Sequence, residues 1–124
     1  MYSCVLLKNP EILMSHLINN GYLKDIILND EWEIICHHMT INMGGIEKGP
    51  GDLNDKNVQL TVTDIAKDDK VCAVKCEGYP TLNKIPHITI AVNRSRGGKP
   101  VQSNQLSNWE PIVNIVVEGE VVEI

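Results

Sequence analysis

One four-residue pattern, His-x-Thr-Ile, occurs twice in this chain of 124 residues, at positions 38–41 and 87–90. Each copy lies in a run that predicts a β-strand, residues 31–43 for the first and 86–93 for the second. Side chains alternate between the two faces of a strand, so in each copy the histidine and the threonine share a face. The apolar residues between them can pack on a core, which leaves the polar pair facing a groove. The two copies therefore predict one shared site.

Length and composition favour a single domain over residues 1–124. The chain is 43% hydrophobic and 22% charged, as in ordinary soluble proteins, and no apolar run approaches the roughly 20 residues that cross a bilayer. Residues 1–7 lack a basic flank and predict a strand rather than a signal peptide, so we expect a cytoplasmic protein without a membrane partner. The net charge of −5 argues against binding of long duplex nucleic acid and is compatible with a small anionic substrate.

Four cysteines lie in apolar runs without a CxxC motif or zinc-like spacing. We expect them to be reduced core thiols rather than disulfides or metal ligands. They are Cys4, Cys36, Cys72 and Cys76.

The remaining pattern predicts a strand-rich α+β fold with mainly antiparallel sheets and few helices. Asn9 as cap and Pro10 as first helical residue begin an amphipathic helix that ends at Gly21. Its predicted buried stripe comprises Leu13, Met14, Leu17 and Ile18, with His16 on the polar side. Residues 22–30 form either a short second helix or an irregular connection.

Residues 58–65 and 70–76 predict an antiparallel hairpin, because alternating and apolar runs flank a turn-like segment. Residues 112–124 predict one or two closing strands. A polar stretch at 47–56, after the first motif strand, is either a surface excursion or a lid. In the second motif strand, Ala91 is expected to leave room in the groove.

The loop after the second motif strand, residues 94–100, carries three basic side chains and two glycines. Glycines allow the backbone to approach an anion closely. We treat Arg94, Arg96 and Lys99 as candidate substrate-binding residues, and a solvated loop as the alternative. The loop is not a Walker A motif, because it lacks the GxxxxGK[ST] order.

The paired His-x-Thr motifs lie 49 residues apart (87 − 38) and resemble the motif pair of the 2H phosphoesterase superfamily. Within it the chain is most similar to the cyclic phosphodiesterase domains of fungal-type tRNA ligases and to small viral relatives. The resemblance implies a bilobal fold in which two antiparallel sheets line a central groove. It also implies that His38 and His87 are the catalytic pair and that Thr40 and Thr89 bind the phosphate. The chain is short for this superfamily, which indicates that peripheral elements have been lost.

The chemistry of these residue types agrees with the resemblance. Imidazole titrates near neutral pH, so one histidine can take a proton from the attacking water while the other gives one to the leaving oxygen. Threonine hydroxyls can donate to non-bridging phosphate oxygens. Two histidines supply both proton transfers, so we expect neither a metal nor a cofactor. His37 is predicted to be a structural or rim residue, because only His38 has a threonine two residues later.

We therefore expect a metal-independent phosphodiesterase that hydrolyses 2′,3′-cyclic or 2′-linked phosphodiesters of RNA ends or nucleotides. One alternative is a hydrolase of cyclic oligonucleotide messengers, an activity of some viral proteins that resemble this superfamily. Another is a non-catalytic module that binds nucleotides or RNA ends. A histidine metal site is the remaining alternative, although no Asp or Glu shares the strand faces of the motif histidines.

Overall fold

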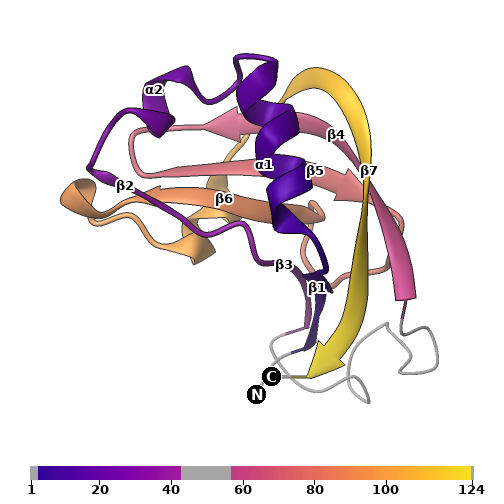
Figure 1. The fold of residues 1–124 in the computed structure, drawn as a ribbon. Helices are drawn as coiled ribbons and strands as arrows, with labels where there is room; N and C mark the ends of the chain where they lie inside the picture. Colours follow the sequence, from indigo (N-terminus) through magenta and orange to yellow (C-terminus); the bar gives the residue numbers. More distant parts are fainter. Residues whose placement is uncertain (1–2, 43–56, 124) are drawn as a thin grey trace.

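The computed structural model describes residues 3–42 and 57–123, and its strands form one antiparallel sheet (Figure 1). The strand order is β2-β6-β3-β1-β7-β4-β5, and β5 also pairs with β6. Six strands thus form a closed ring, and β2 adds to β6 outside it. The elements are β1 (Ser3–Leu7), α1 (Pro10–Asn19), α2 (Lys24–Ile27), β2 (Trp32–Ile34), β3 (His38–Asn42), β4 (Asn57–Lys67), β5 (Val71–Glu77), β6 (His87–Asn93), the 3-10 helices η2 (Arg94–Arg96) and η3 (Pro100–Gln105), and β7 (Glu110–Glu123).

Most elements lie where the sequence predicts them. The first strand, the first helix, the β4–β5 hairpin and the second motif strand are confirmed. The uncertain segment 22–30 contains the short helix α2, and the chain closes with the single strand β7. A mainly antiparallel sheet with few helices is therefore confirmed, and all its strands belong to one continuous sheet. The predicted loop at 47–56 lies outside the described residues.

Helix α1 lies across the sheet and buries a narrower stripe than its pattern predicts (Figure 1). Leu13 and Leu17 are fully buried and Met14 is half-buried. The prediction that Ile18 is buried is wrong, because its side chain is 42% exposed. The Nε2 atom of His16 lies 2.6 Å from the backbone oxygen of Val113 in β7. This contact connects the helix to the last strand.

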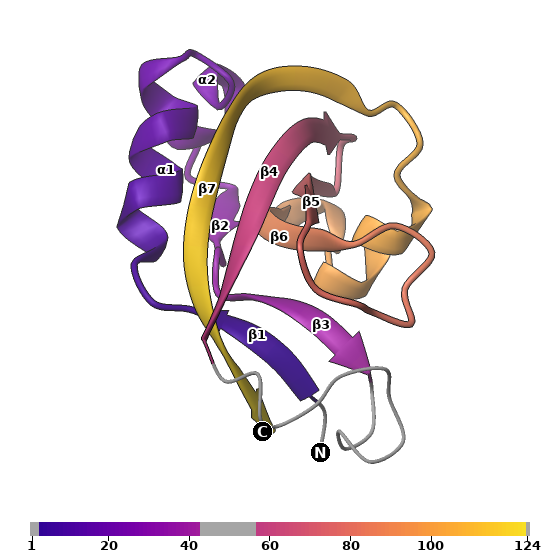
Figure 2. The ribbon, with the colours of Figure 1, turned by 90° about the vertical axis from the view of Figure 1, so that its right-hand side faces the viewer.

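Apolar side chains cover both faces of β5. Cys72 and Val74 belong to the main core, together with the buried leucines of α1. Val71 and Ala73 point the other way and pack in a second, smaller cluster that includes Leu106, just after η3. Figure 2 shows α1 and α2 on one side of the molecule and the chain that follows β6 on the other. A strand covered on both faces has a continuous apolar sequence, as residues 71–74 do.

The prediction of one continuous strand over residues 31–43 is wrong. The run is interrupted between β2 and β3, where Cys36 has a φ of +47°. This backbone turn places Cys36 in the main core, although strand alternation would have put it beside His38 in the groove. The interruption allows β2 and β3 to pair with different parts of β6, while β3 also pairs with β1.

All four cysteines are buried and free of disulfides, as predicted. Burial raises the pKa of Cys4 and Cys36 to about 11 and that of Cys72 and Cys76 to about 12. These thiols are therefore protonated near neutral pH and unreactive as nucleophiles. Within the described ranges, no helix is long and apolar enough to span a membrane.

Candidate active site

The two motifs lie side by side because their middle residues pair across the sheet. Met39 of β3 is the partner of Ile88 of β6, in antiparallel register. This register places His38 next to Thr89 and Thr40 next to His87. Met39 and Ile88 are both fully buried in the main core. Since neighbouring residues of a strand face opposite ways, the four polar side chains point away from that core.

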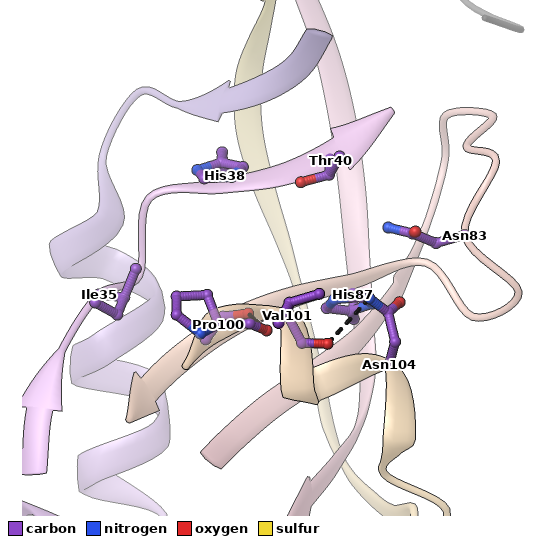
Figure 3. Close-up of a pocket in the computed structure, with 9 residues that line it drawn as sticks. Ile35, His38, Thr40, Asn83, His87, Pro100, Val101 and Asn104 are labelled. Carbon is purple, nitrogen blue, oxygen red and sulfur yellow. Dashed lines mark hydrogen bonds between the residues drawn. The ribbon is translucent and has the colours of Figure 1, made fainter. Parts of the chain in front are cut away.

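These four side chains line one pocket of about 400 Å³. Figure 3 labels three of them, His38, Thr40 and His87. The volume is in the range of pockets that hold a small organic molecule. His38 and Thr40 come from β3, His87 and Thr89 from β6, and the remaining wall comes from η3 and two connecting segments. The described lining residues are Ile35, His38, Thr40, Asn83, His87, Thr89, Pro100, Val101 and Asn104.

The ring of His87 is held by a backbone carbonyl. Its Nδ1 atom lies 2.8 Å from the oxygen of Ile85, and the side chain is 7% exposed. A carbonyl can only accept, so Nδ1 carries the proton and Nε2 is left to exchange a proton with a ligand. Burial lowers the pKa of His87, and the hydrogen bond to Ile85 opposes this by raising it.

His38 lies in a different electrostatic setting. Burial lowers its pKa most, and the nearby charges of His37 and His87 lower it further. The ring centroids of His37 and His38 are 6.3 Å apart, and the His37 side chain is exposed. Two imidazolium ions in one pocket repel each other, so the pair of motif histidines holds one proton more readily than two.

The two threonines are held from opposite ends of the site. The Thr89 hydroxyl lies 2.8 Å from the buried hydroxyl of Ser103 in η3. On the other motif, Thr81 donates from Oγ1 to the backbone oxygen of Thr40, at 2.6 Å. The same Thr81 oxygen accepts a hydrogen bond from the backbone N–H of Asn83, at 3.1 Å. This contact fastens the segment before β6 to β3 and places Asn83 at the pocket (Figure 3).

Several lining residues were missed by the sequence reasoning. Asn83 lies in an irregular segment, and Val101 and Asn104 lie in η3, where no strand period exists to read. Pro100 was the available signal, since proline is frequent at the first position of a helix. The expectation that Ala91 opens the groove is wrong. A bulge shifts the β5–β6 register there, and Ala91 is fully buried in the main core.

The three basic residues of the loop lie outside the described pocket lining. Arg94 pairs with the carboxylate of Glu33, whereas Arg96 and Lys99 are exposed. Lys99 directly precedes Pro100 and so lies nearest to the pocket along the chain. Gly98 has a packing role, because a Cβ atom built there would lie 2.1 Å from the backbone oxygen of Lys70. The close fit holds the loop against the turn before β5 and directs the chain into η3.

The described residues contain no group of three His, Cys, Asp or Glu side chains placed to hold a metal ion. The donors at the pocket are imidazoles, hydroxyls and carboxamides. Such a set can move protons and donate hydrogen bonds to an anion.

Comparison with protein families agrees with this geometry. The model of the fungal tRNA ligase phosphodiesterase domain matches residues 28–121, which include both motifs and most of the sheet. Comparison with curated proteins and with solved structures found no match. A match over more than half of the chain is sufficient to assign a family, so this chain belongs to the family of fungal tRNA ligase phosphodiesterase domains.

Proposed function

We propose that this protein is a metal-independent phosphodiesterase that opens 2′,3′-cyclic phosphates, on nucleotides or at RNA ends. The observation that carries the proposal is the meeting of His38, Thr40, His87 and Thr89 in one pocket, delivered by two paired strands. Membership of a phosphodiesterase family supports the same reaction class. We infer that the paired motif strands are this chain's form of the two-lobed 2H phosphoesterase site.

In the proposed reaction, a water oxygen attacks the phosphorus atom and one phosphorus–ribose oxygen bond breaks. One imidazole accepts the proton of the water, and the other gives a proton to the released ribose oxygen, so the product is a phosphomonoester. We assign the base to His38, because burial and two neighbouring imidazoles favour its neutral form. Burial lowers the pKa of His87 as well, but the hydrogen bond from its Nδ1 to the carbonyl of Ile85 opposes this lowering, so we assign the acid to His87.

The hydroxyls of Thr40 and Thr89 flank the imidazoles and donate to the non-bridging oxygens in this proposal, where negative charge grows in the transition state. The apolar side chains of Ile35, Pro100 and Val101 offer a surface for the sugar and base. No described lining residue carries a fixed charge. A pocket with that lining suits a monoanionic diester better than a multiply charged end.

The experiment is incubation of the purified protein, in the presence of a chelator, with a panel of phosphodiesters. The panel contains nucleoside 2′,3′-cyclic phosphates, RNA with a cyclic phosphate end, 2′,5′-linked oligonucleotides and cyclic oligonucleotides, and products are separated by chromatography. We expect a phosphomonoester from the 2′,3′-cyclic phosphates, with undiminished rate under chelation. Turnover of cyclic oligonucleotides alone would replace the proposed substrate, and ligand binding without any turnover would indicate a binding module.

A further inference from the structure

A buried hydroxyl lies behind one of the two phosphate-binding threonines. Ser103 belongs to η3, is 1% exposed, and places its Oγ atom 2.8 Å from Oγ1 of Thr89. Thr89 also donates a longer hydrogen bond, of 3.4 Å, to the backbone oxygen of Pro100. Ser103 itself does not line the pocket, so it can act on a ligand only through Thr89.

The direction of the hydrogen bond between the two hydroxyls follows from counting protons. Each hydroxyl has one proton to donate and can accept from others. If Thr89 donated to Ser103, the buried Ser103 proton would be left without an acceptor among the described residues, which is unfavourable for a buried donor. If Ser103 donates to Thr89, both protons are used, because Thr89 then donates to Pro100.

We propose that Ser103 is a positioning residue that keeps the Thr89 hydroxyl as a donor toward the substrate phosphate. Ser103 fills a lone pair of the Thr89 oxygen, so the proton of Thr89 can point only along its long hydrogen bond to the Pro100 carbonyl or into the pocket. An arriving phosphate oxygen then takes over from the Pro100 carbonyl, and no other bond has to break. Thr40 serves as an internal comparison, because no such hydroxyl partner of its side chain occurs in the described part of the chain. This inference rests on the proposed phosphate-binding role of Thr89.

A double-mutant cycle tests the inference, using Ser103→Ala, Thr89→Val and the double variant, with Thr40→Val as the matched control background. The readouts are kcat/KM on a nucleoside 2′,3′-cyclic phosphate and the affinity for a nucleoside 2′-monophosphate by calorimetry. We expect Ser103→Ala to lower kcat/KM about tenfold in the parent and in Thr40→Val, and less than twofold in Thr89→Val. Ser103→Thr, which keeps the hydroxyl, should restore most of the loss.

An equal loss in the Thr89→Val and Thr40→Val backgrounds would overturn the inference, since it would show a merely structural effect of Ser103. No loss in the parent would overturn it as well. If the parent binds the monophosphate without hydrolysing any diester, the proposed hydrolase falls, and the same pattern in the affinities would still support the role of Ser103. A parent that neither binds nor hydrolyses would contradict both proposals.

Discussion

Met39 and Ile88, the middle residues of the two motifs, are paired across adjacent strands and are both fully buried. Among the described residues this is the only strand-pairing contact between β3 and β6. It determines which polar side chain of one motif lies opposite which polar side chain of the other. A slip of one residue would turn a whole motif from the pocket into the core. The position of the site therefore depends on apolar packing behind it.

The first prediction concerns this packing. Ile88→Ala should lower the free energy of unfolding by about 2–5 kcal/mol, because it leaves a cavity in the main core. Denaturant unfolding followed by circular dichroism measures the effect. Leu82→Ala is the matched control, since the Leu82 side chain is 62% exposed and its truncation should cost little. Equal losses in the two variants would contradict the account of the core.

The second prediction concerns pH. The base must be neutral and the acid protonated, and the pKa values of both His38 and His87 are lowered from the ordinary 6.5. The profile of kcat/KM should therefore be bell-shaped, with its maximum on the acid side of pH 6.5. A plateau that extends above pH 8 would contradict this assignment of the proton-transfer groups.

His37 provides a control for the same profile. Its positive charge lowers the pKa of His38, so His37→Gln should raise that pKa and move the acidic limb to higher pH. The maximal rate should stay within about threefold of the parent, because His37 is exposed and does not line the pocket. An unshifted acidic limb would mean that the base is not His38.

The third prediction separates the acid from the base. A nitrophenyl ester releases an oxygen that needs no proton, so general-acid catalysis contributes little to its cleavage. His87→Ala should lower the rate of hydrolysis of the cyclic phosphate by about 10²–10⁴-fold, and that of a nucleotide 4-nitrophenyl ester by less than tenfold. His38→Ala should lose activity on both substrates. The opposite pattern would exchange the two roles.

The fourth prediction concerns the basic loop. Arg96 and Lys99 are exposed and lie within four residues of the lining residue Pro100 in the sequence, so Lys99→Gln and Arg96→Gln should each raise KM a few-fold at low salt. Arg94→Gln should have a smaller effect, because the guanidinium of Arg94 is already engaged by Glu33 and is not available to contact the substrate. Steady-state kinetics at two salt concentrations measures the difference. An equal, salt-independent effect of all three changes would indicate that the loop does not attract the substrate.

The parts of this site that could be predicted from the sequence depend on local alternation. Within 38–41 and 87–90 the strands are regular, so the facing of His38, Thr40, His87 and Thr89 follows from a period of two. The prediction fails at Cys36 and Ala91, where a positive φ and a bulge reverse the facing of the side chains. The residue types at these two positions give no sequence signal for a positive φ or a bulge.

The remaining wall could not be predicted, because it is brought to the pocket by contacts distant in sequence. Asn83 is placed by the bond from Thr81 to the backbone of β3, about 40 residues away. Val101 and Asn104 are placed by η3, which the close fit of Gly98 and the buried Leu106 hold against the sheet. The glycines suggested an anion-binding loop, which stays a prediction, and the structure shows a packing role for Gly98.

The most direct test of the central claim is a scan of all four histidines under one assay. His16→Gln, His37→Gln, His38→Gln and His87→Gln are compared for hydrolysis of a 2′,3′-cyclic phosphate in the presence of a chelator, with folding checked by circular dichroism. The account predicts that only the His38 and His87 variants lose turnover, by at least about 10²-fold each, while all four remain folded. Retention of full activity by either of these two variants would contradict it.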